Sequence, residues 1–226
     1  MKTRGFFRLL KSEIATRINW ASLYGRISYS QEGEDLILQK IFSERGNGFY
    51  VDVGAHHPFR YSNTFLFYLQ GWNGINIDPT PGVMAYFNRT RRRDINLELA
   101  ICDGLGKKTL YLFEDSALNT LSEKRAQSVI KSKQSPFLKE REITISRLKD
   151  VLRKHPPPHK RIDYLNVDVE GVELQVLESH DWFHYSPRVI SVENFSTRSA
   201  SPISKYMKKR GYTFIAQTTS TQLYQL

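Results

Sequence analysis

The sequence contains a single cysteine, Cys102, so no disulfide can form within the chain. Such sparse cysteine usage is typical of a reducing compartment, and we expect a cytoplasmic protein. No spacing of cysteine and histidine matches a zinc site. Long hydrophobic runs are also lacking, since none reaches the roughly 18 residues that a membrane span needs. The first residues do not show the apolar core and small-residue cleavage site of an export signal.

Two phosphate-binding motifs are absent as well. The sequence has neither G-x-G-x-x-G, which marks dinucleotide-binding turns, nor G-x-x-x-x-G-K-[ST], the P-loop. The first absence disfavours NAD as a ligand, and the second excludes a P-loop.

Acidic residues are outnumbered by basic ones. The chain has 33 lysine and arginine residues against 23 aspartate and glutamate residues, which gives a formal net charge of +10. This excess favours an anionic partner, whether nucleic acid, anionic lipid or an acidic glycan, and does not choose among them.

Residues 1–28 form a segment of their own before the main domain, which we expect over 29–226. Apolar residues recur in the segment at helical spacing and are interleaved with basic ones, a pattern that predicts a basic amphipathic helix. Two interpretations stay open. The helix either lies through residues 1–20 on the inner face of an anionic membrane, or packs on the domain or on a neighbouring subunit of a homo-oligomer.

Strand and helix patterns alternate along the rest of the chain. We expect strands at 48–54, 73–78, 94–101, 107–113, 142–145, 162–168 and 188–194, with helices at 62–71, 82–93, 147–155, 171–179 and 204–211. Strands separated by helices predict a doubly wound, mostly parallel α/β sheet. The last two strands, at 212–217 and 221–226, read as an antiparallel hairpin.

The segment 114–141 is polar, charged and without a clear period. A segment of this length inside a compact domain is typical of a functional lid or insert. We therefore interpret it as an insert that covers an acceptor molecule.

Acidic residues stand at the ends of several predicted strands. Asp52, Asp78 and Asp168 end three of them, and Glu193 and Asn194 end a fourth. Ligands of open α/β sheets bind beyond the carboxyl ends of the strands, so these groups should meet in one crevice. Burying charge without a partner is unfavourable, and the cluster therefore predicts a ligand site.

The turn after the first strand suggests which ligand binds. Gly54 permits a close approach of the backbone, and Asp78 suits a carboxylate that binds the two hydroxyls of a ribose. The alternative for Asp78 is a turn-forming role before Pro79. The turn carries bulky side chains such as His56, so the phosphate-free S-adenosylmethionine fits it better than NAD does.

Five ordered blocks now carry a family resemblance: SQEGEDLIL, FYVDVGAHHPFRYSNTFLF, GWNGINIDPTPG, RRRDINLELAI and IDYLNVDVEGVELQVLES. Together they resemble the FkbM family of S-adenosylmethionine-dependent methyltransferases, from about residue 28 to 195. The resemblance implies a class I methyltransferase, Rossmann-like fold with seven strands, the last one antiparallel. It also implies methyl transfer to oxygen, often on a sugar of a surface glycan or on a natural product.

The resemblance also assigns cofactor residues. Asp52 and Gly54 form the first cofactor loop, and Asp78 takes the ribose. Ser62 either binds the methionine carboxylate at the start of a helix or only caps that helix. The remaining expected contacts are Gln31 and Glu34, which close the pocket, and Ala100 and Ile101, which flank the adenine.

The acceptor hydroxyl must lose its proton during methyl transfer, which calls for a metal or a general base. Asp168, Glu193 and Asn194 are similar to the metal ligands of Mg²⁺-dependent catechol O-methyltransferases, and such oxygen ligands suit Mg²⁺ or Mn²⁺. Glutamate at 193 departs from the aspartate of that pattern. For a base, His56 and Glu170 are alternatives, each with a structural role as the competing interpretation.

Two other functions fit parts of the sequence. A nucleic-acid methyltransferase fits the charge, but the stretch DVEGVE after Asp168 lacks the Pro-Pro-aromatic motif of base methylation. A non-enzymatic adaptor at a membrane surface fits the N-terminal helix, but it would not need Asp52, Gly54 and Asp78. We therefore expect a small-molecule or glycan acceptor and no nucleic acid.

Overall fold

The computed structural model describes residues 25–194 and 201–226. Residues 25–28 form no helix, and the rest of the amphipathic helix expected at 1–28 lies outside the described residues. Among the residues described, no helix is long and apolar enough to cross a membrane.

The centre of the protein is a seven-stranded sheet with the strand order β3-β2-β1-β7-β8-β10-β9. The strands are β1 (Phe49–Val53), β2 (Asn73–Asp78), β3 (Ile95–Glu98), β7 (Tyr164–Val167), β8 (Val189–Glu193), β9 (Thr213–Gln217) and β10 (Thr221–Gln225). The first five strands in this order, β3, β2, β1, β7 and β8, pair in parallel. Strand β10 is antiparallel to both of its neighbours, β8 and β9. The predicted mostly parallel sheet with a closing antiparallel hairpin is confirmed.

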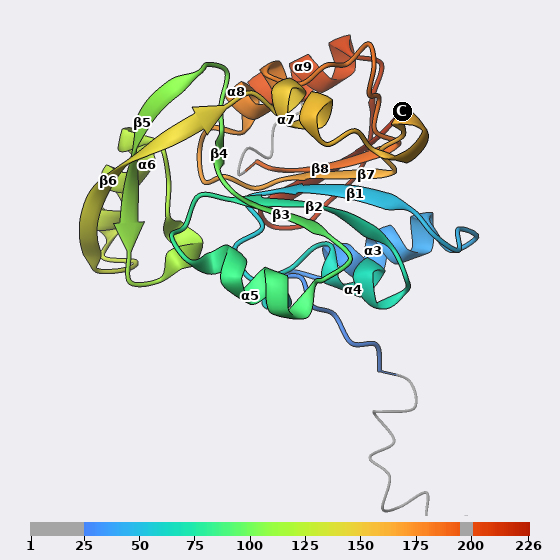
Figure 1. The fold of residues 1–226 in the computed structure, drawn as a ribbon, viewed down its shortest axis with the longest axis horizontal. Helices are drawn as coiled ribbons and strands as arrows, with labels where there is room; N and C mark the ends of the chain where they lie inside the picture. Colours follow the sequence, from blue (N-terminus) through green and yellow to red (C-terminus); the bar gives the residue numbers. More distant parts are fainter. Residues whose placement is uncertain (1–24, 195–200) are drawn as a thin grey trace, which may run out of the picture.

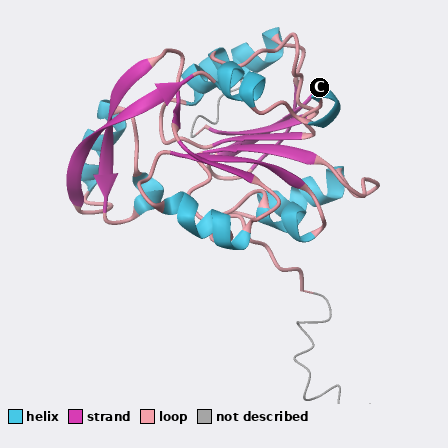
Figure 2. Cartoon of the chain, in the orientation of Figure 1, coloured by secondary structure: helices cyan, strands magenta, loops and turns pink. Residues whose placement is uncertain are grey.

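Helices cover both faces of this sheet (Figures 1 and 2). One layer contains α3 (Glu34–Ile41), α4 (Phe65–Leu69) and α5 (Val83–Thr90), and the other contains α7 (Leu148–Lys154), α8 (Glu173–Glu178) and α9 (Pro202–Lys209). A short 3₁₀ turn, η2 (Pro158–Lys160), leads from α7 towards β7.

Strand β1 shows why the sheet is buried on both sides. All five of its residues are buried. Val51 and Val53 pack in the core that includes α7 and α8, whereas Tyr50 packs with Phe67 of α4. Because successive side chains of a strand point to opposite faces, Asp52 lies on the α4 side with Tyr50.

The single strand expected at 94–101 is wrong. Residues 95–98 form β3, but β4 (Ala100–Ile101) belongs to a second, three-stranded sheet with β6 (Phe137–Ser146) and β5 (Gly106–Phe113). Leu99 is the joint between the two sheets: its N–H donates to the Asp78 carbonyl at 3.2 Å, and the next residue already pairs with Ile145. The apolar pattern continues through the joint, so it does not reveal the change of partner.

The segment 114–141 has secondary structure of its own. It contains a 3₁₀ turn, η1 (Ser116–Leu118), then α6 (Glu123–Ser132) and the first half of β6. Ala126 and Val129 of α6 pack against Phe113, and most side chains of β6 are exposed. The segment is therefore part of the second sheet, and it stands beyond one end of the main sheet (Figure 1).

Candidate active site

A cavity of about 360 Å³ lies where the carboxyl ends of β1, β2 and β7 face the second sheet. This volume is in the range of small-molecule sites. The predicted site residues that line it are Gln31, Asp52, Gly54, His56, Asp78, Ala100, Ile101, Asp168, Glu170 and Glu193. Glu34, Ser62 and Asn194 are not part of this lining.

Gly54 allows the loop after β1 to touch the end of β7. Its φ is +84°, and a Cβ atom added there would lie 1.5 Å from the backbone oxygen of Asp168. No other residue type fits this space, and only glycine adopts this φ without strain. The glycine thus brings the floor of the cavity and Asp168 together.

Asp52 is buried and fully held by neighbouring side chains. Thr64 donates its hydroxyl to Oδ2 at 2.6 Å, and Asn166 donates Nδ2 to Oδ1 at 2.9 Å. Burial raises the pKa of Asp52, although these two hydrogen bonds act in the opposite direction. The carboxyl group therefore fixes the shape of the cavity floor as well as lining it.

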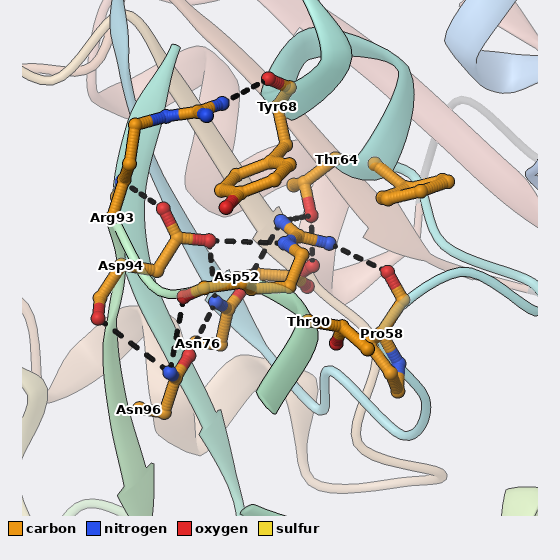
Figure 3. A network of polar contacts seen from close by, with 12 residues as sticks. Asp52, Pro58, Thr64, Tyr68, Asn76, Thr90, Arg93, Asp94 and Asn96 are labelled. Carbon is orange, nitrogen blue, oxygen red and sulfur yellow. Dashed lines mark hydrogen bonds and ion pairs between the residues drawn. The ribbon is translucent and has the colours of Figure 1, made fainter. Parts of the chain in front are cut away.

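A buried arginine that sequence reasoning missed lies behind Asp52. Arg91 is fully buried, and its Nη2 donates to Thr64 Oγ1 at 2.8 Å, while Nε donates to Asp94 Oδ2 at 3.0 Å. Its Nη1 also donates to the Pro58 carbonyl at 3.0 Å. Figure 3 shows this network between Pro58, Thr64, Asp52 and Asp94. The arginine ties the end of α5 to the loop after β1, and an Arg-Arg-Arg-Asp run alone does not signal such burial.

Asp78 takes part in the turns that follow β1 and β2. Its Oδ2 accepts the backbone N–H of His56 at 2.9 Å, and its Oδ1 accepts that of Thr80 at 2.8 Å. Each carboxylate oxygen can accept a second hydrogen bond, so these contacts leave room for hydroxyl donors. The turn-forming role and the ribose role are thus compatible.

One part of the cavity is apolar. It is lined by Ile77, Leu99, Ala100, Ile101, Leu110 and Leu121. Because these side chains come from both sheets, the apolar part of the cavity lies across their joint. A flat apolar ring next to Asp78 would fit this surface.

Two of the predicted cofactor residues have hydrogen-bond partners within the protein. The Ser62 hydroxyl accepts the N–H of Phe65 at 3.2 Å, at the start of α4. Glu34 is buried and accepts the hydroxyl of Thr218 at 2.8 Å. Glu32, which sequence reasoning did not select, lines the cavity and accepts the N–H of Ser220 at 3.1 Å.

Three carboxyl groups converge at the other side of the cavity. Oxygen atoms of Asp168, Glu170 and Glu193 lie within 4.8 Å of one another. Burial and the neighbouring carboxylates raise the pKa of both Asp168 and Glu193. Burial also raises the pKa of Glu170, against the effect of the Arg125 guanidinium.

The expected metal ligands are only partly brought together. Asn194 donates Nδ2 to Ser201 Oγ at 2.9 Å and to Gln222 Oε1 at 2.8 Å, away from the cavity lining. Glu170 stands with Asp168 and Glu193 where Asn194 was expected. Side chains alternate along an extended chain, so 193 and 194 do not face the same way.

His56 contributes an unusual ring to the cavity wall. Both ring nitrogens are buried and have no hydrogen-bond partner among the described residues. Burial lowers the pKa of His56 below its usual value of 6.5, which favours the neutral, proton-accepting imidazole at neutral pH. The ring therefore carries a nitrogen lone pair and no positive charge at neutral pH.

Comparisons with known proteins give one extended match. A family model described as "Methyltransferase FkbM domain" matches residues 52–214. The curated "Methyltransferase sdnD" of Sordaria araneosa is 37% identical over 79 residues, which cover 31% of this chain and 30% of that protein. The chain thus matches less than a third of the length of this relative. Among solved structures, the "delta-N METTL16 MTase domain" has 11% identity and a TM-score of 0.34, over 84% of this chain and 78% of that one.

Proposed function

Because the chain belongs to the FkbM methyltransferase family, we propose that it transfers a methyl group from S-adenosylmethionine to a hydroxyl oxygen of a small-molecule or glycan acceptor. The observation that carries the proposal is a single cavity with two chemically different parts. An apolar surface beside Asp78 suits an adenosine, and a group of carboxyls with a neutral histidine suits a hydroxyl that loses its proton.

The residues around Asp78 fit the cofactor. Asp78 would accept the ribose hydroxyls, and Ala100 and Ile101 would contact the adenine. Gly54 and Gln31 would contact the methionine part, where the tight turn leaves no space for a side chain at 54. When bound, the cofactor supplies an electrophilic methyl group on a sulfonium.

The side chains around the cluster of three carboxyl groups would bind the acceptor and take up its proton. The acceptor oxygen forms a bond to the methyl carbon as the bond from carbon to sulfur breaks, and the hydroxyl proton must leave. The neutral ring of His56 and the carboxyl of Glu170 both line the cavity and are the two candidate proton acceptors. Neutral imidazole is the form that this step requires.

Metal assistance belongs to the same proposal, with a changed set of ligands. Asp168, Glu170 and Glu193 would hold the ion, and such hard oxygen donors suit Mg²⁺ or Mn²⁺. When bound, a divalent ion acidifies a hydroxyl that it contacts.

Calorimetric titration of S-adenosylmethionine into the full-length protein tests the proposal. We expect binding by the wild type, and at least ~10-fold weaker binding by Asp78→Asn, because a charge-assisted hydrogen bond to the ribose is lost. Glu114→Gln is the matched control, since Glu114 is exposed and outside the cavity. Absence of binding to the wild type would overturn the proposal, and an unchanged affinity in Asp78→Asn would remove Asp78 from the cofactor site.

A further inference from the structure

Glu170 has a backbone conformation that side chains rarely adopt. Its φ is +58°, in the left-handed region, and Gly171 follows with a φ of +111°. A non-glycine residue in this region is strained, and it stays there only when its surroundings hold it. Of the three carboxylate residues, Asp168 and Glu193 stand at the ends of β7 and β8. Glu170, the strained one, lies in the loop after β7.

Two residues of the insert 114–141 hold Glu170. The Thr120 hydroxyl donates to the Glu170 carbonyl at 2.7 Å. Arg125 donates Nε to the carboxylate oxygen Oε2 at 2.8 Å, and its Nη2 forms an ion pair with the same oxygen at 2.8 Å. Both contacts of Arg125 fall on the same oxygen, and Oε1 has no hydrogen-bond partner among the described residues. The backbone and one side-chain oxygen are fixed, and the other oxygen stays available.

The insert also packs directly on the following residue. A Cβ atom added to Gly171 would lie 3.3 Å from the Cβ atoms of Ser122 and Arg125. Ser122 is the N-cap of α6, and its hydroxyl accepts the Arg125 N–H. The first turn of α6 therefore rests against the loop that carries Glu170.

Glu193 gives an independent reason to expect a ligand at this place. Its side chain lines the cavity, the residue is only 8% exposed, and its carboxylate has no hydrogen bond or ion pair with any residue that the structure describes. A buried carboxylate normally has a cation or donors as partners. Together with Asp168 and Glu170 it offers three oxygen ligands within 4.8 Å of one another.

We propose that Thr120 and Arg125 are positioning residues, which hold Glu170 in its strained conformation so that the insert completes a divalent-cation site made by Asp168, Glu170 and Glu193. The proposal rests on the proposed function and adds a role for the insert beyond covering an acceptor. Groups that orient the ligands of a metal affect its affinity even though they do not touch it.

Arg125 could act in the opposite direction, because its positive charge repels a cation. If Arg125 acts mainly by orienting Glu170, removal of the arginine weakens cation binding. If it acts mainly by repelling the cation, removal of the arginine strengthens cation binding. Thr120 separates the two effects, since its hydroxyl holds the Glu170 backbone without carrying a charge. Its hydroxyl also accepts the N–H of Ser122, so the conservative replacement by serine is needed as a control.

The test measures Mn²⁺ affinity of the full-length protein by electron paramagnetic resonance, with S-adenosylmethionine affinity measured in parallel. We expect Thr120→Val and Arg125→Ala each to weaken Mn²⁺ binding ~10- to 100-fold. Thr120→Ser and Arg125→Lys should recover most of the loss. Lys124→Ala, an exposed neighbour on α6, is the matched control and should bind as the wild type does.

Unchanged or tighter Mn²⁺ binding in Thr120→Val and Arg125→Ala would overturn the proposal. A wild type that binds S-adenosylmethionine but not Mn²⁺ also overturns it, and leaves the proposed methyl transfer standing. A wild type that binds Mn²⁺ with the expected pattern but no S-adenosylmethionine supports the cation site and contradicts the proposed function. If Thr120→Val does not fold, the comparison between Arg125→Ala and Arg125→Lys decides.

Discussion

His180 is a buried side chain that has no part in the cavity. Its Nε2 lies 2.6 Å from the Tyr185 carbonyl, and because a carbonyl only accepts, Nε2 carries the proton. The other ring nitrogen, Nδ1, is buried without a hydrogen-bond partner among the described residues. Burial lowers the pKa of His180 from 6.5 to about 4, so the folded protein keeps this ring neutral.

This burial predicts a loss of stability in mild acid. As the pH falls below 6.5, the unfolded chain takes up a proton at His180 and the folded protein does not, so unfolding becomes more favourable. The loss continues until the pH reaches about 4, where the folded protein is protonated too, and amounts to about 3 kcal/mol. Urea unfolding of the wild type and of His180→Gln between pH 7 and pH 4.5 measures it. Equal pH dependence in both proteins would contradict the prediction.

Single residues of the cavity were predictable where one strong pattern fixes them. Asp52, Asp78 and Asp168 follow apolar strands, so their place at the carboxyl edge could be read directly from the sequence. Glu170 was predicted only as a candidate base, because its left-handed backbone depends on contacts from Thr120 and Arg125, which are distant in sequence.

At the scale of elements, part of the cavity floor is formed where β1 pairs with β7. The two strands pair in parallel, and the Asp168 N–H donates to the Val53 carbonyl at 2.9 Å. The loop that leaves β1 must then turn at Gly54 directly against the backbone of β7. This close contact is possible because residue 54 is a glycine and has no side chain.

Gly54→Ala is therefore expected to be far more damaging than an alanine at another left-handed glycine. Gly82 has a φ of +82° and no atom within 4 Å of an added Cβ, so Gly82→Ala measures the conformational strain alone, about 1 kcal/mol. Gly54→Ala adds a collision with the Asp168 oxygen and should cost at least ~3 kcal/mol more, or prevent folding. The free energies of unfolding of the two variants give the comparison. Similar values would show that the β7 backbone can move away.

Most strands of both sheets were predictable as elements, since those expected at 107–113 and 142–145 match β5 and the end of β6, but their separation into a second sheet was not. Alternating strand and helix patterns from 48 to 101 match β1, α4, β2 and α5 closely. The stretch 94–101 kept a single apolar pattern although its two ends pair with different strands. Strand patterns report burial, and they do not report which strand is the partner.

At the scale of the whole molecule, the positive charge is unevenly spread. Residues 1–24 contain five of the basic residues and a single acidic residue, Glu13. Basic side chains of α9 form a second group, with Lys205, Lys208 and Lys209 exposed. The first group also carries the apolar series from Phe6 to Ile18, and this combination is typical of segments that bind membrane surfaces.

Contact of the N-terminal segment with an anionic membrane is one of the two interpretations left open by the sequence, and truncation tests it. We expect the full-length protein to co-sediment with vesicles that contain phosphatidylserine, and a variant that begins at residue 25 to lose most of this binding. Neither protein should bind vesicles of phosphatidylcholine alone. Equal binding by both proteins would assign the contact to another basic surface, with α9 as the first candidate.

The fold class could be predicted from the sequence because order and period of the elements suffice for it. The position of the insert could not be predicted, since several of its contacts with the main domain, such as Asn119 with Thr80 and Arg125 with Glu170, are polar pairs between residues distant in sequence. The cavity lies between the two sheets. The wall formed by the main sheet could therefore be predicted from the sequence, whereas the wall formed by the second sheet and the insert could not.

Because the cavity lies across the joint at Leu99, a bound ligand would stabilise the arrangement of the two sheets. A molecule that fills the cavity would contact Asp78 in one sheet and Ala100 in the other, so it would add contacts between two sheets that Leu99 joins along the chain. A ligand present at 100 times its dissociation constant adds about 2.7 kcal/mol to the stability of the form that binds it. Under the proposed function, saturation with cofactor would therefore add to the free energy that holds the second sheet against the main one.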